Sequence, residues 1–138
     1  MIFWSKKKRQ FELPRFPETV APTFKALCEA LDPEHVPELR KAVNDCLADS
    51  REKGKKNDTL DVEGAEEIAK RCNYLLDNYD TYSVEHRAMV IGAVRYFAIA
   101  EDPFDDETFA TGFHDDKRVM NYVLEEIGLE DQYIDLDY

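Results

Sequence analysis

Residues 65–79 read AEEIAKRCNYLLDNY and place an apolar side chain at every third or fourth position. The apolar positions are Ala65, Ile68, Ala69, Cys72, Leu75, Leu76 and Tyr79. This spacing puts them on one face of an α-helix, which turns once in about 3.6 residues. A half-buried strand would need alternation with a period of two, and no segment of the sequence has it. The stretch therefore predicts a helix of about four turns and an all-α fold.

Four further segments carry the same periodicity, at about residues 20–31, 36–47, 84–100 and 119–127. Asp32-Pro33, Gly54 and Gly128 lie between or after them, where proline and glycine commonly start and end helices. Residues 88–100 are apolar nearly all round, so we expect the helix at about 84–100 to lie at the centre. The sequence predicts a compact single-domain bundle of about five helices, with a short extra helical turn near residues 103–110.

Two terminal segments flank the predicted helical domain, which spans residues 18–128. Residues 1–17 form a basic and aromatic N-terminal arm, and residues 129–138 form an acidic C-terminal tail that either folds back or frays. Three interpretations of the arm compete. It packs on the domain through its aromatic side chains, it makes peripheral contact with a membrane surface, or it is a flexible tail.

The charge of the chain is strongly negative and unevenly distributed. The formal net charge is −12 over 138 residues, although residues 1–17 carry five Lys/Arg and one Glu. Residues 99–138 carry thirteen Asp/Glu and two Lys/Arg. This balance argues against nucleic-acid binding, which needs a basic footprint. An acidic face suits a basic protein partner, although acidic surfaces also serve solubility alone.

The cysteines and the hydropathy pattern indicate a cytoplasmic protein. Cys28, Cys46 and Cys72 are odd in number, widely spaced and without metal-ligand spacing, which favours reduced thiols in a core. No secretory signal is visible. The most apolar run, from Ala88 to Ala100, contains Arg95 and is shorter than a membrane span of about 20 residues.

The stretch DPFDDETFATGFHDD, residues 102–116, concentrates the acidic residues. We interpret it first as a structural turn, in which Asp102 caps a short helix and Gly112 ends it. Asp115 or His114 then begins the last helix, and Asp116 lies in its first turn, where the helix dipole favours negative charge. Arg95 lies in the preceding helix, so we expect one of these acids to pair with it.

The same stretch resembles a known family. Its spacing is D-x3-D-x5-G-x2-D-D at Asp102, Asp106, Gly112, Asp115 and Asp116. Tyr96-Phe97 before it and Val119 after it also fit. Over about residues 91–127 the chain resembles the YkvA-like domain, a small bacterial helical domain of unknown function. The resemblance implies a helix–turn–helix at this place and no established activity.

Two chemical interpretations of the cluster remain open beside the structural one. Asp102, Asp106, Asp115 and Asp116 are oxygen donors of the kind that Mg²⁺ or Ca²⁺ prefers. His114-Asp115, with His86 upstream and an acid from residues 131–137, resembles the ligand set of helical metal-dependent phosphohydrolases. No motif for a nucleophilic serine, a catalytic cysteine or a phosphate-binding loop is present in the sequence.

These observations favour a non-enzymatic interaction module with an acidic surface and no cofactor, of the immunity or partner-neutralising type. The alternative is a divalent-cation-binding domain, or a cation-dependent hydrolase, built on the cluster at residues 102–116.

Overall fold

The computed structural model describes residues 10–13, 20–58, 60–99 and 113–135. These residues contain α1 (Val20–Leu27), α2 (Val36–Gly54), α3 (Val62–Asp77), α4 (Val84–Ala98) and α5 (His114–Ile127). Short 3₁₀ helices lie at η1 (Pro33–His35), η2 (Tyr79–Thr81) and η3 (Glu130–Gln132), and the described segments contain no strand. The all-α prediction is confirmed. The helical turn predicted near residues 103–110 lies outside the described residues.

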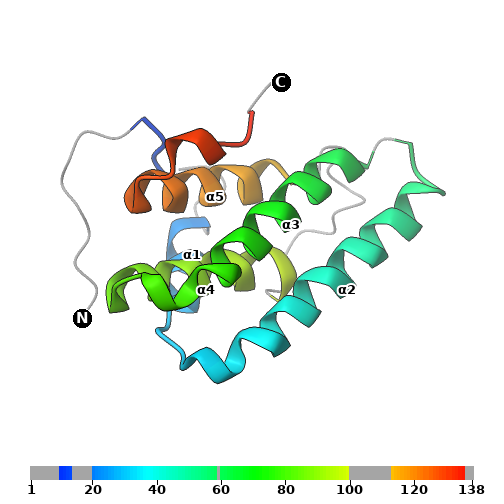
Figure 1. Cartoon of the computed structure of the whole chain (residues 1–138). Helices are drawn as coiled ribbons and strands as arrows, with labels where there is room; N and C mark the ends of the chain where they lie inside the picture. Colours follow the sequence, from blue (N-terminus) through cyan, green and yellow to red (C-terminus); the bar gives the residue numbers. More distant parts are fainter. Residues whose placement is uncertain (1–9, 14–19, 59, 100–112, 136–138) are drawn as a thin grey trace.

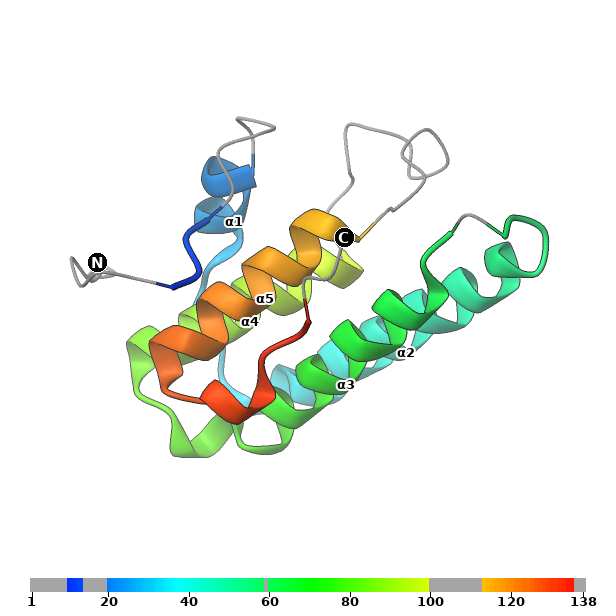
Figure 2. The same cartoon turned by 90° about the horizontal axis from the view of Figure 1, so that it is seen from above.

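The helices form a bundle around α4. Helices α2 and α3 lie side by side, and α5 packs along α4 (Figures 1 and 2). Helix α4 contacts all four other α-helices, and every residue from Ala88 to Val94 is buried. The predicted central position of this segment is therefore confirmed.

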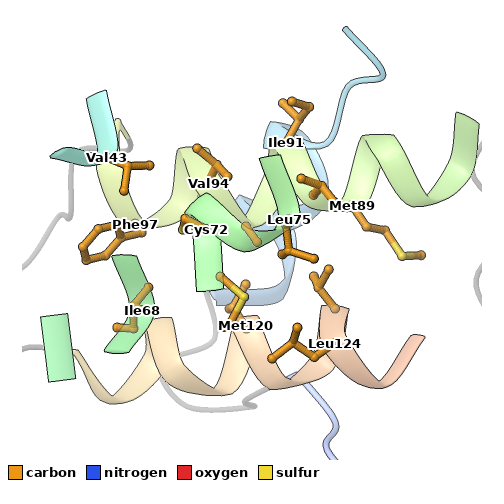
Figure 3. Close-up of a cluster of buried hydrophobic side chains, with 14 of the residues drawn as sticks. Val43, Ile68, Cys72, Leu75, Met89, Ile91, Val94, Phe97, Met120 and Leu124 are labelled. Carbon is orange, nitrogen blue, oxygen red and sulfur yellow. The ribbon is translucent and has the colours of Figure 1, made fainter. Parts of the chain in front are cut away.

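The core is built from side chains of all five α-helices. Ile91 and Val94 have no exposed surface, as their place in the central helix predicts. In Figure 3, side chains of α2, α3, α4 and α5 meet in one cluster that includes Val43, Cys72 and Leu124. Burial of this apolar surface is the main force that holds such a bundle together.

Helix α1 approaches α4 closely at Gly92. A Cβ atom at residue 92 would lie 2.5 Å from Cys28 Sγ and 2.9 Å from Phe24 Cε1. Glycine is therefore the residue that lets the two helices meet at this distance. Phe24 is fully buried at the contact and also packs edge-on against Tyr122 of α5.

The helix boundaries follow local hydrogen-bonding groups. Ser83 caps α4, which begins at Val84, and the Ser83 side chain accepts a hydrogen bond from the amide of His86. Gly128 ends α5 with φ of +89°, and the amide of Leu129 donates to the carbonyl of Leu124. This is the Schellman arrangement that glycine favours.

The first helix is shorter than the sequence predicts, and a separate 3₁₀ turn lies between it and α2. The first helix ends at Leu27, although the apolar spacing continues to Leu31. Asp32 precedes η1 without a side-chain capping bond, and α2 begins only at Val36. Pro33 therefore starts a separate 3₁₀ turn, because proline suits the first positions of a helical segment.

No helix within the described residues is long and apolar enough to cross a membrane.

Candidate functional site

The N-terminus of α5 carries the described part of the acidic stretch. Helix α5 begins at His114, and Asp115 and Asp116 lie in its first turn, as expected. The residue that precedes it, Phe113, is buried and packs against Phe97 of α4 at a ring-centroid distance of 5.9 Å. Asp102, Asp106 and Gly112 lie outside the described residues, so their roles in the turn stay predictions.

An ion pair joins this helix end to the start of α3. Lys117 Nζ lies 2.7 Å from Asp61 Oδ2, and the side chains are 13% and 28% exposed. Asp61 Oδ1 also accepts a hydrogen bond of 2.8 Å from the amide of Gly64, so Asp61 caps α3. One carboxylate therefore caps one helix and pairs with another.

The electrostatics of Asp61 favour its charged form. Burial by itself raises the pKa of this carboxyl group, but the Lys117 ammonium, the Gly64 amide and nearby His114 together hold its pKa below the ordinary value. Gly64 makes room for the pair, because a Cβ at residue 64 would lie 2.8 Å from Lys117 Cε. This pair was not predicted from the sequence, in which the position of Asp61 just before the apolar periodicity of α3 is the available signal.

Arg95 of α4 has a carboxylate partner, Glu29, two residues after the end of α1. Its guanidinium lies 3.0 Å from Glu29 Oε1 and donates a hydrogen bond of 3.1 Å to the carbonyl of Leu27. We expected its carboxylate partner in residues 102–116, and Glu29 lies outside that stretch. Arg95 instead closes the end of α1, whose last carbonyls need donors. A pairing with Asp102 or Asp106 stays a prediction, because both lie outside the described residues.

The described residues do not assemble a metal centre. Within these segments no three His, Cys, Asp or Glu side chains are placed to hold one ion. The proposed set also needs Asp102 and Asp106, so the cation hypothesis stays untested. His86 lies in the first turn of α4, and Asp131 lies in η3.

Two of the three cysteines, Cys28 and Cys72, are poor nucleophiles. All three are free thiols. Burial raises the pKa of Cys28 to about 12, despite the opposing charge of Arg95, and it also raises the pKa of Cys72, which is fully buried. Because the thiolate is the reactive form, both thiols are inert at neutral pH.

The tail and part of the arm lie against the helices. Ile134 is buried, and both its amide and its carbonyl bond to the side chain of Asn121. The amides of Gln10 and Phe11 donate to the carboxylate of Glu125. The tail thus folds back over residues 129–135, and residues 10–13 pack on the domain as one interpretation of the arm predicted.

The C-terminal part of the described chain is acidic. Residues 113–135 include seven Asp/Glu and two Lys/Arg, a formal charge of −5. Glu130, Asp131 and Asp135 are exposed, and none of the three forms an ion pair with another described residue. On α2, by contrast, Lys41 pairs with Asp45, and Arg40 pairs with Asp77 of α3.

A shallow depression of about 520 Å³ lies along the N-terminal half of α2. Its polar side chains include Arg40 and Asn44, which a hydrogen-bonded chain through Asn73 links to α3. Within this depression these polar groups bond to one another.

Compared with known proteins, the chain matches no family model, no curated protein and no solved structure. The resemblance to the YkvA-like domain over about residues 91–127 therefore stays a hypothesis.

Proposed function

We propose that this protein is a non-enzymatic binding module that recognises a basic protein partner through its C-terminal acidic surface. That surface, which we call the acidic face, consists of Glu130, Asp131 and Asp135 with the adjoining end of α5. The observation that carries the proposal is the exposure of these three carboxylates without a cation partner in the described structure. Unneutralised charge of one sign steers an oppositely charged partner during encounter.

The rest of the described structure supports a binding role over a catalytic one. The thiols of Cys28 and Cys72 are protonated at neutral pH, and the polar side chains around α2 pair with one another. A partner-neutralising protein of the immunity type needs only a stable scaffold and a complementary surface. The three free cysteines fit a reducing compartment such as the cytoplasm.

Binding of a short polylysine peptide, measured by isothermal titration calorimetry at low and high salt, tests the proposal. We expect saturable binding to the native chain that weakens with salt, because exposed charges are screened. The triple variant Glu130→Gln, Asp131→Asn, Asp135→Asn should lose most of this affinity.

A matched control separates a localised face from the overall charge. The triple variant Glu34→Gln, Glu38→Gln, Glu52→Gln removes the same charge from exposed positions on η1 and α2. It should bind the peptide nearly as the native chain does. Equal losses in the two variants, or no binding by the native chain, would contradict the proposed face.

A further inference from the structure

The tail is held through its main chain. The side chain of Asn121 is fully buried, and its Nδ2 donates to the carbonyl of Ile134 at 2.9 Å. Its Oδ1 accepts from the amide of the same residue at 2.7 Å. A neighbouring β-strand would bond both groups of one residue in the same manner. Arg71 Nε of α3 adds a hydrogen bond of 2.8 Å to the carbonyl of Gln132.

The arm is held on the same helix, also through its main chain. Glu125 lies one turn beyond Asn121, and its two carboxylate oxygens accept from the amides of Gln10 and Phe11 at 2.8 and 2.9 Å. In Figure 1 the segment of residues 10–13 (dark blue) lies beside the C-terminal part of α5. The two terminal segments therefore occupy adjacent sites on one helix.

A ring contact joins the two segments to each other. Phe11 meets Tyr133 edge to face, with ring centroids 4.6 Å apart. Each ring thus loses a neighbour if the other segment leaves. Aromatic pairs of this geometry add stability beyond the area they bury, so the departure of one segment weakens the other.

We propose that residues 10–13 and 132–135 form one clasp, which opens and closes as a unit while the helical core stays folded. The clasp includes hydrogen bonds to side chains of α3 and α5, the ring pair, and apolar packing by Leu13, Tyr133 and Ile134, whereas α4 is enclosed by four helices. Segments with few apolar contacts open at lower free energy than the core of the same protein. Gly128, with its positive φ, marks the end of α5 from which the tail departs.

The clasp has a regulatory consequence. Residues 6–9 read KKKR and directly precede the clasped Gln10, while the tail carries exposed acids. Because coupling between two sites is reciprocal, a ligand that binds the released arm also favours release of the tail. The clasp itself does not depend on the proposed acidic face.

Amide hydrogen exchange of the full chain, measured by NMR, tests the coupling. Phe11→Ala changes the arm and is read at the amide of Ile134, and Tyr133→Ala changes the tail and is read at the amide of Gln10. Both reporter amides should exchange roughly two- to tenfold faster, the effect of losing one aromatic pair. The amide of Val94, in the core, should keep its rate.

Tyr74→Ala is the matched control, since it removes a partly exposed aromatic ring from α3. It should leave the amides of Gln10 and Ile134 unchanged. An effect confined to the mutated segment would overturn the proposal, because the segments would then be independent. Equal acceleration at Val94 would also overturn it, because the clasp would then be part of the global unfolding unit.

Discussion

The ion pair between Lys117 and Asp61 gives a quantitative prediction. Lys117→Met keeps an unbranched apolar stem of similar length but leaves the Asp61 carboxylate without its ammonium partner. Loss of one member of a fully buried pair costs about 3–5 kcal/mol. Asp61 is 28% exposed and keeps the hydrogen bond from Gly64, so water and one amide still stabilise its charge. We therefore expect a loss of roughly 1–3 kcal/mol.

Urea unfolding followed by circular dichroism measures this loss, and a double-mutant cycle isolates the pair. Asp61→Asn keeps the cap, because Asn caps helices about as well as Asp, but it leaves the Lys117 ammonium unpaired. The double variant carries neither charge. Its loss of stability should therefore be about 1 kcal/mol smaller than the sum of the two single losses. Lys55→Met, in the exposed pair with Glu52, is the control and should change stability by less than about 0.5 kcal/mol.

The loss of stability caused by Lys117→Met should become smaller as the pH falls. The pKa of Asp61 is lowered in the folded state. Its contribution is therefore fully present above the unfolded pKa of about 3.9 and is lost as the pH falls through the lower folded value. The difference between native chain and Lys117→Met should shrink in that acid range. A Lys117→Met loss below about 0.5 kcal/mol at neutral pH would refute the reasoning and indicate a solvent-screened pair.

Four further predictions concern the core, the helix contact, the arginine and the acidic stretch. Ile91→Ala should lower stability by roughly 1–4 kcal/mol in urea unfolding, and a change within 0.5 kcal/mol would mean that α4 is not central. Gly92→Ala should destabilise, because overpacking of about 1–3 kcal/mol exceeds the helix-propensity gain of about 1 kcal/mol; adding Cys28→Gly should recover part of the loss. Arg95→Leu should cost less than about 2 kcal/mol, since its carboxylate partner is 60% exposed; a larger loss would point to a second, buried partner. Titration calorimetry with Mg²⁺ and Ca²⁺ should give flat traces, and saturable binding that Asp116→Asn removes would favour the cation site.

The sequence predicts the helices well because their signal is local. The apolar period of α3 and the nearly uniform apolarity of residues 88–100 both follow from burial, and Ser83 and Gly128 mark helix ends through chemistry within a few residues. The extent of α1 was predicted less well, because an apolar side chain can pack on a core from a loop as well as from a helix. Leu31 does so, since it packs against the core outside any helix.

The polar contacts were harder to predict because they join distant parts of the chain. Asp61 and Lys117 are 56 residues apart, and the sequence around either residue gives no signal that the other is its partner. Asn121 interrupts the apolar stripe of α5, and its buried side chain bonds to Ile134 of the returning tail. Arg95 was expected to need a carboxylate, but Glu29 follows a helix whose packing angle the sequence does not specify.

The way in which Asn121 and Arg71 hold the tail bears on how this protein can change. Both side chains contact main-chain atoms of residues 132 and 134, which every amino acid except proline at residue 134 supplies equally. The side chains of Glu130, Asp131 and Asp135 are exposed and take no part in those bonds. The charge that the tail presents to solvent can therefore change by substitution at these three positions. The hydrogen bonds that hold the tail to Asn121 and Arg71 do not depend on these side chains. Under the proposed function, such substitutions would change the partner that the acidic face prefers, while the helical scaffold stays the same.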